Sequence, residues 1–356
     1  MKICILGDGL TSLVLAKILL NKKISVDILC ENKVINYSNS RTIGITKKNY
    51  DFFSDEVTQL KNISWKLDNI EIYTENLPNK KILEFNKINS EIFSIIRNHQ
   101  LYKNLNVELK KNKLFNKKLL KNNELAIINQ YNLVINCNKN HLITKKFFSK
   151  KIEKKYDSIA HTAIIKHKKI DNKSAMQIFT KIGPIAFLPI SNFETSIVYS
   201  INTINQVDLA NLINKYNRKY SILKILDQTS FELGSLSLRK YLYKNILCFG
   251  DLIHKIHPLA GQGFNMTIRD IIELSNIIDE KIELGLELNS SIFEEFEKKT
   301  KHRNFIFSQG IDLIYNFFDK ERKFNGEFIS NSLQYLGKNK YFKEIFSKFA
   351  DEGLTL

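Results

Sequence analysis

Residues 3–31 read ICILGDGLTSLVLAKILLNKKISVDILCE, and this stretch decides the fold class. A short apolar strand, Ile3 to Leu6, runs into the turn Gly7-Asp8-Gly9. An apolar helix from Thr11 to Leu20 follows, and a second strand covers Ser25 to Cys30. Short connections of this kind favour parallel strands joined by a right-handed crossover. The stretch therefore predicts the first β-turn-α-β unit of an α/β sheet.

The turn in this unit has the features of a dinucleotide-binding loop. Its glycines permit a tight turn and a close approach of the backbone to a pyrophosphate, which would rest on the amide-rich helix start. Ser12 stands where the fingerprint usually has a third glycine or alanine, and it is small enough for close packing. Glu31 follows the second strand at the spacing expected for an acid that holds a ribose hydroxyl. The alternative is a tight turn in an α/β unit that binds nothing. The cofactor-binding candidates here are Gly7, Gly9, Leu10, Thr11, Ser12 and Glu31.

A second long motif occupies residues 250–270, GDLIHKIHPLAGQGFNMTIRD. A buried strand delivers Asp251, a proline turn follows, and Gly261-Gln262-Gly263 opens a helix. Asp251 can accept hydrogen bonds from sugar or ribityl hydroxyls. The glycines let backbone amides approach a planar ring whose reduced form is anionic, and a helix start favours that charge. The pattern predicts flavin binding.

Two histidines in this motif, His254 and His257, could be read as metal ligands. A third ligand with suitable spacing is not found nearby, and the histidines lie close to the proline turn. We therefore favour a packing or hydrogen-bonding role and predict no metal site.

The remaining strand signals are far apart in the sequence. Leu133 to Cys137 and Asn245 to Gly250 read as further buried strands of the nucleotide-binding sheet. Tyr156 to Leu238 reads as an insert of antiparallel strands, within which Val207 to Lys224 is expected to form one or two helices. After Thr267 the periodicity predicts helices nearly to the end.

These patterns define an α/β fold class. We predict a Rossmann-like FAD-binding domain with an inserted antiparallel-sheet substrate domain and C-terminal helices. The predicted boundaries are 1–70, 95–150 and 240–300 for the discontinuous FAD-binding domain, 71–94 and 151–239 for the sheet domain, and 301–356 for the helical region.

The second motif resembles the GDAAH-x-x-HP-x-AGQG-x-N-x-x-x-RD signature of the ubiquinone-biosynthesis hydroxylases, a branch of the flavin aromatic hydroxylases with the para-hydroxybenzoate hydroxylase-like fold. Other segments are similar to the family in the same order. They are Ser40 to Thr46 (R-x-x-x-L-S), Tyr156 to Ala163 (Y-x-Q-x-A), Gln177 to Pro189 (Q-x-F-x-x-x-GP-x-A-x-LP), and the tail around Arg303 and Phe317-Phe318. The resemblance spans nearly the whole chain.

The resemblance implies an FAD-dependent monooxygenase that hydroxylates the aromatic ring of a ubiquinone precursor, a prenylated phenol or quinone precursor, with NAD(P)H as co-substrate and O2. The cofactor carries the hard chemistry in such enzymes, so we assign no catalytic residue. Asp251 and Glu31 are expected to hold the ribityl and ribose portions of FAD. The residues expected to line the flavin are Arg41, Pro258, Gly261, Gln262 and Gly263, and the neighbouring candidates are Gly250, Phe264 and Asn265.

One departure from the family lies after the middle strand. The family usually carries G-A-D-G there, whereas this chain has Asn136-Cys137-Asn138-Lys139. Asn138 cannot supply a negative charge, and Lys139 cannot adopt a glycine conformation cheaply. One alternative is therefore a flavin-binding but catalytically impaired assembly or scaffold protein of the ubiquinone pathway. A separate alternative is a different flavin enzyme on the same fold, a hydroxylase of a soluble phenol.

Composition narrows the choice of partners. The 356 residues carry a net charge of +17, but the lysines are scattered and their densest clusters lack interleaved aromatics, which argues against nucleic-acid binding. The four cysteines have neither metal-ligand nor redox spacing, which indicates a reducing cytoplasm.

A contact with a membrane is a separate hypothesis. The chain has no uninterrupted apolar run of about 18 residues, so no membrane-spanning helix is predicted. We expect a cytoplasmic protein. Its positive charge and C-terminal aromatics suggest a peripheral contact with the inner face of an anionic membrane. The resemblance also implies other ubiquinone-pathway proteins as partners. The alternative is that the aromatics Phe305, Phe307, Phe317 and Phe318 are simply core.

Overall fold

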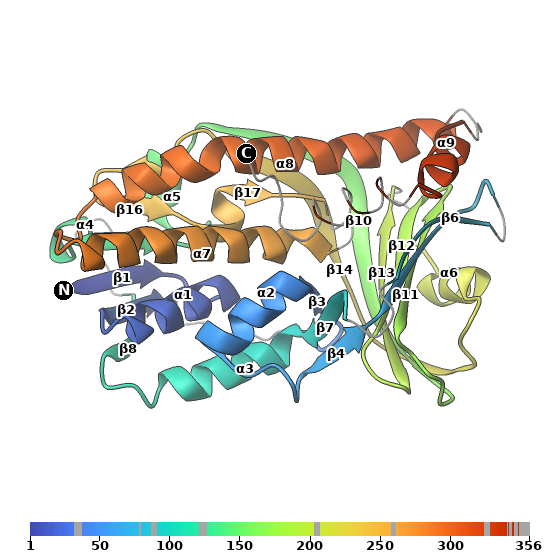
Figure 1. Cartoon of the computed structure of the whole chain (residues 1–356), viewed down its shortest axis with the longest axis horizontal. Helices are drawn as coiled ribbons and strands as arrows, with labels where there is room; N and C mark the ends of the chain where they lie inside the picture. The colour runs from blue at the N-terminus through green and yellow to red at the C-terminus, as the bar shows by residue number, and fades with distance from the viewer. Residues whose placement is uncertain are drawn as a thin grey trace.

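The computed structural model describes residues 1–31, 38–77, 80–86, 91–120, 127–202, 207–257, 261–323, 328–339 and the single positions 341, 344 and 348. Two large sheets lie toward opposite ends of its long axis, and the longest helix runs above both (Figure 1). The predicted α/β fold class is confirmed.

The first sheet has six strands in the order β15-β16-β9-β1-β2-β8. Every neighbouring pair is parallel except the β15–β16 hairpin. The central strands β1, β9 and β16 read as almost continuous apolar runs because they are covered on both faces. The edge strand β8 is mostly exposed. The strands are β1 (Lys2–Leu6), β2 (Ser25–Cys30), β8 (Phe115–Leu119), β9 (Leu133–Asn136), β15 (Leu242–Tyr243) and β16 (Ile246–Cys248).

The second sheet has eight strands in the order β17-β14-β10-β13-β12-β11-β5-β6 and is antiparallel except for the β11–β5 pair. One face is covered by α6 (Leu209–Tyr216), whose Leu209 and Ile213 join a core with Phe187 and Tyr199. The strands are β5 (Asn69–Thr74), β6 (Lys81–Asn86), β10 (Lys151–His167), β11 (Ser174–Thr180), β12 (Gly183–Pro189), β13 (Glu194–Ile201), β14 (Ile222–Leu238) and β17 (His254–Lys255).

Smaller elements connect the two sheets. A three-stranded antiparallel sheet is formed by β3 (Thr42–Thr46), β7 (Phe93–Arg97) and β4 (Ser64–Leu67). The helices are α1 (Leu10–Asn21), α2 (Lys47–Phe52), a π-helical turn (Phe53–Val57), α3 (Asn98–Leu109), α4 (Ile127–Gln130), α5 (Leu142–Phe147), a 3-10 turn (Gly250–Leu252), α7 (Gln262–Glu283), α8 (Ser291–Lys323) and α9 (Phe328–Leu336).

The helix α8 ties the two ends of the molecule together. Its first turns bury Phe293 and Phe296 in the core of the first sheet. Farther along, Phe318 stacks on Phe179 of the second sheet with ring centroids 3.6 Å apart. Because one rigid helix enters both cores, it fixes the distance between the sheets.

Most predicted elements are confirmed, and one is wrong. The prediction of helix over Val207 to Lys224 holds only for α6, which ends at Tyr216, and Ile222 already belongs to the 17-residue strand β14. This strand pairs with β10 over most of its length, and that long-range pairing outweighs its weak local pattern. The predicted domain boundaries stay a prediction.

Gly183 provides a test of the second sheet. It has φ +142°, and a Cβ built on it would lie 1.7 Å from the Ser200 carbonyl oxygen on the neighbouring strand β13. Gly183→Ala should therefore lower the free energy of unfolding by at least about 3 kcal/mol. Gly285→Ala is the matched control, because Gly285 also has positive φ but nothing lies within 4 Å; it should cost only about 1 kcal/mol. Urea denaturation of both variants measures the difference, and equal losses would contradict this account.

Candidate functional site

A cavity of about 1200 Å³ lies where the first sheet meets the second. Its wall includes Gly9 to Ser12 after β1, Cys137 after β9, and Phe249 with Asp251 after β16. These are carboxyl ends of parallel strands, the edge where open α/β sheets bind ligands. The rest of the wall comes from β3, β7 and the second sheet.

The start of α1 supplies unused backbone donors. Gly9 is the N-cap, no side chain caps this helix, and its first turn carries no acidic residue. The first N–H groups are thus available to an anion such as a pyrophosphate. Gly7 lies behind this turn, where a Cβ would be 3.3 Å from Cβ of Asn138. Glycine is needed there so that the β1 turn can pack against the end of β9.

The start of α7 forms a second wall of the cavity. Gly261 is its N-cap with φ +64°, and Gln262, Gly263 and Phe264 line the cavity. The Gln262 side chain is 4% exposed, and its Oε1 has no hydrogen-bond partner among the described residues. Asn98 also lines the cavity, and its buried Oδ1 likewise has no hydrogen-bond partner among the described residues. Unpaired buried acceptors are costly, so this wall fits a ligand that presents N–H or O–H donors.

Asn265 lies behind the wall and holds it together. Its Nδ2 donates to the carbonyl oxygens of Gly44 (2.9 Å) and Gly261 (3.1 Å). Its Oδ1 accepts from the Thr46 N–H (3.0 Å) and from Asn49 Nδ2 (2.8 Å). The amide is fully buried, and both its donors and its acceptor oxygen are hydrogen-bonded. The structure therefore gives Asn265 a positioning role, and its predicted contact with a cofactor stays a prediction.

The two sequence motifs meet at the 3-10 turn after β16. Gly250 packs so closely on α1 that a Cβ there would lie 3.0 Å from Thr11 Cγ2. The next residue, Asp251, is exposed and lines the cavity. Arg41 lines it from the other side, with its guanidinium 5.2 Å from the centroid of the Phe231 ring.

The predicted candidates divide into three groups. Gly7, Glu31, Gly250 and Asn265 are not part of the cavity wall. Pro258 lies outside the described residues. The candidates that the structure brings together around the cavity are Gly9, Leu10, Thr11, Ser12, Arg41, Asp251, Gly261, Gln262, Gly263 and Phe264. Their contacts with a cofactor stay a prediction.

The sequence did not reveal the other half of the wall, which belongs to the second sheet. This half is mostly apolar and includes Ile70, Ile72, Met176, Leu188, Val198 and Phe231, with Gln177 and Thr162 as polar members. Ile92 and Phe93 at the start of β7 and Ile256 after β17 extend the apolar surface. Alternation along β5 marks Ile70 and Ile72 as one face of a strand. It does not tell which face meets a cavity, because both faces of this sheet are covered.

The two histidines take part in packing and hydrogen bonding. His254 Nε2 lies within hydrogen-bond distance of Asp270, which also accepts from Asn304 Nδ2 at 2.9 Å. The His257 ring stacks on Tyr315 with centroids 4.3 Å apart and meets Tyr156 edge-on at 5.1 Å. The described residues contain no group of His, Cys, Asp and Glu suited to a metal ion.

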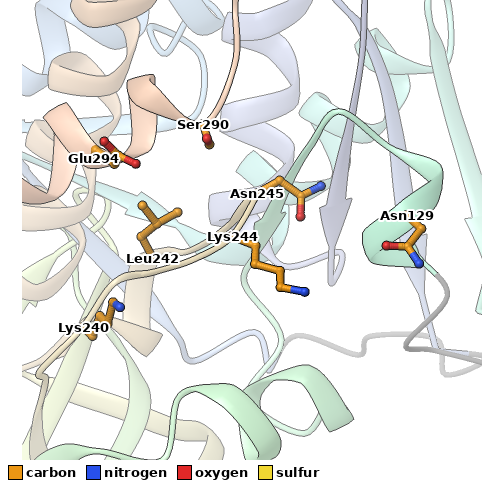
Figure 2. A pocket seen from close by; sticks show the side chains of 7 residues that line it. All are labelled: Asn129, Lys240, Leu242, Lys244, Asn245, Ser290 and Glu294. Atoms are coloured by element: carbon orange, nitrogen blue, oxygen red, sulfur yellow. The ribbon is translucent and has the colours of Figure 1, made fainter.

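A second, open hollow of about 570 Å³ shares no lining residue with this cavity. Asn129 precedes β9 and Asn245 precedes β16, so this hollow includes the amino ends of the parallel strands. Mostly polar and charged side chains line it, among them Lys240, Lys244 and Glu294 (Figure 2). We do not regard it as a site, because α/β sheets bind ligands at the opposite edge.

Comparison with known proteins agrees with this geometry. A family profile described as FAD binding domain matches residues 202–283, which include Asp251 and the start of α7. The p-nitrophenol 4-monooxygenase PnpA from Pseudomonas putida DLL-E4 superposes with a TM-score of 0.77 at 10% identity, covering 99% of this chain and 98% of that one. Klebsiella pneumoniae HpxO, complexed with FAD and uric acid, superposes with a TM-score of 0.73 at 10% identity, covering 99% of this chain and 96% of that one. The chain has the fold of the FAD-dependent monooxygenases, and residues 202–283 are similar to an FAD-binding domain.

Among curated proteins, the 3-demethoxyubiquinol 3-hydroxylase of Escherichia coli (strain K12) is 28% identical over 155 residues, 41% of this chain and 40% of that protein. The ubiquinone biosynthesis monooxygenase COQ6 of Dictyostelium discoideum is 25% identical over 183 residues, which cover 40% of this chain and 37% of that protein. The chain thus spans about two fifths of the length of these relatives. The resemblance to ubiquinone-biosynthesis hydroxylases is confirmed.

Asn265 allows a test of how the site is held. Asn265→Ala removes four hydrogen bonds and takes this side-chain partner from the Thr46 N–H, the Asn49 amide and the carbonyl oxygens of Gly44 and Gly261. We expect the free energy of unfolding to fall by about 3 kcal/mol. Asn211→Ala on the exposed face of α6 is the control and should change it by less than about 1 kcal/mol. A similar, small loss for both variants in urea denaturation would refute the positioning role.

Proposed function

We propose that this protein is an FAD-dependent monooxygenase that hydroxylates the aromatic ring of a ubiquinone precursor, with NAD(P)H and O2 as co-substrates. One observation carries the proposal: a single cavity joins two uncapped, glycine-rich helix starts to an apolar sheet wall. The first part suits a phosphorylated cofactor with a polar ring edge. The second suits an apolar aromatic substrate.

FAD, when bound, supplies the electron transfer between NAD(P)H and O2. The residues of the chain would bind and orient the cofactor and the substrate, and they would exclude water from the site. The start of α1 would hold the pyrophosphate, and Asp251 would accept hydrogen bonds from ribityl hydroxyls. Gln262 and the first N–H groups of α7 would meet the polar edge of the flavin, where the helix start favours negative charge.

The substrate would lie against the second sheet. The side of the cavity formed by this sheet is mainly aliphatic and aromatic. The cavity extends to Glu84 and Asn86 at the end of β6 and to Lys338 after α9. A phenol ring near the flavin and an isoprenoid tail leading toward β6 would use this length. This shape favours a prenylated substrate over a small soluble phenol.

The unusual Asn138-Lys139 pair does not argue strongly for an inactive scaffold protein. Lys139 is not among the described residues with positive φ, so it is not forced into a glycine conformation. The backbone carbonyl of Asn138 is hydrogen-bonded, since it accepts from Thr144 Oγ1 at 2.7 Å.

The direct test is anaerobic reduction. The purified protein should bind FAD, and NADPH or NADH should bleach the flavin band, faster when a prenylated phenol is present. Admission of air should then give one hydroxylated product, identified by mass spectrometry. Asp251→Ala should weaken FAD binding by about tenfold or more if it holds ribityl hydroxyls.

Two other outcomes would contradict the proposal. Bound FAD that stays oxidised with both nucleotides would favour the scaffold function. Equal turnover of phenols with and without a prenyl tail would favour a hydroxylase of soluble phenols.

We also propose a peripheral contact with an anionic lipid surface through α8. Phe307 and Phe318 are core residues, but Phe305 (38%), Ile306 (45%), Leu313 (52%) and Phe317 (45%) are exposed. Lys298 and Lys320 flank these four side chains on the exposed part of the helix, whereas Asp312 between them is buried. An apolar stripe bordered by cations fits the boundary between acyl chains and anionic headgroups. None of the helices in the described part of the chain combines the length and apolar character needed to cross a membrane.

Vesicle sedimentation tests this surface. The protein should bind vesicles of phosphatidylglycerol and phosphatidylcholine at low salt and be released as salt rises. The double substitution Leu313→Ser and Phe317→Ser should reduce binding at least about fivefold, because it removes two apolar anchors. Leu223→Ser is the control, since Leu223 is 67% exposed on β14. Equal binding by both variants would eliminate α8 as the contact.

A further inference from the structure

Asn138 is the residue at which this chain departs from its family, and the structure gives its side chain a definite task. Its Nδ2 donates to Glu31 Oε1 at 3.2 Å, joining the segment after β9 to the end of β2. Glu31 is exposed and has no other hydrogen-bond partner among the described residues. This contact is therefore what orients the carboxylate.

The orientation of the Asn138 amide follows from its surroundings. Its Oδ1 accepts from the Asn140 N–H at 2.9 Å. Its own N–H donates to Asn136 Oδ1 at 3.0 Å, and its carbonyl accepts from Thr144 Oγ1 at 2.7 Å. Rotating the amide would place Nδ2 against an N–H and Oδ1 against a carboxylate. The donor face must therefore point to Glu31.

The same geometry shows why an acid would not serve at this position. A carboxylate at 138 could still accept from Asn140, but its second oxygen would face the Glu31 carboxylate at hydrogen-bond distance. Two like charges in contact repel, and Glu31 would turn away.

We infer that Asn138 is a positioning residue that holds Glu31 toward the adenosine ribose of FAD, so that the family's aspartate would weaken cofactor binding in this chain. The inference rests on the proposed FAD site. Glu31 follows β2 beside the uncapped start of α1, which is where a ribose carboxylate is needed in a dinucleotide fold. Asn138 packs on Gly7 of the same turn.

The experiment is a titration of the apoprotein with FAD and, separately, with FMN, which lacks the adenosine half. Asn138→Ala should lower FAD affinity about threefold and Asn138→Asp about tenfold. High salt should reduce the defect of Asn138→Asp but not that of Asn138→Ala, because only the former is a repulsion between exposed charges. FMN affinity should not change in either variant.

A charge swap completes the test. Glu31→Gln combined with Asn138→Asp restores a donor facing an acceptor, so FAD affinity should recover relative to Asn138→Asp alone. Asn211→Asp, an exposed change on α6, should leave both affinities unchanged.

The outcomes are distinguishable. Wild-type affinity for FAD in Asn138→Asp, or an equal loss of FMN and FAD affinity, would overturn this inference and leave the proposed function standing. Failure of the wild-type protein to bind FAD would instead overturn the proposed function.

Discussion

The buried amide of Asn265 is the interaction on which the site depends. It ties the start of α7 to β3 and α2, segments more than 200 residues away in the sequence. Both β3 and α7 contribute walls of the cavity, so their separation is set by this side chain. A buried amide that uses both donors and accepts twice tolerates little displacement, since any movement leaves a polar group unpaired.

The rest of the site follows from topology. Parallel strands that come from distant parts of the chain place their carboxyl ends at one edge. Each end delivers a different chemical group: amides from α1, a carboxylate from Asp251, and the small side chain of Cys137. The second sheet then contributes an apolar wall, and α8 holds the sheets at a fixed distance by entering both cores. The polar and the apolar parts of the cavity wall are thus adjacent but come mainly from separate sheets.

Local motifs made part of this arrangement predictable. The β1–α1–β2 unit and the Gly261 helix start depend on residues next to each other in the sequence, where turn geometry and helix starts are encoded directly. What could not be predicted depends on distant partners. β14 is stabilised by pairing with β10, and the role of Asn265 arises from backbone groups of β3. The exposure of Phe317 and the burial of Phe318 also depend on which face of α8 meets the second sheet.

The same reasoning explains why a departure from a family motif need not signal lost function. Judged alone, Asn138-Lys139 lacks the charge and the glycine of the family pattern. In the structure, Lys139 needs no glycine conformation, and the amide of Asn138 supplies a donor to Glu31 that a carboxylate could not. The two positions form one unit with the end of β2, so their chemistry has to be judged as a pair. A motif position is best interpreted through the group that it faces, because that partner determines whether a charge, a donor or an acceptor is needed.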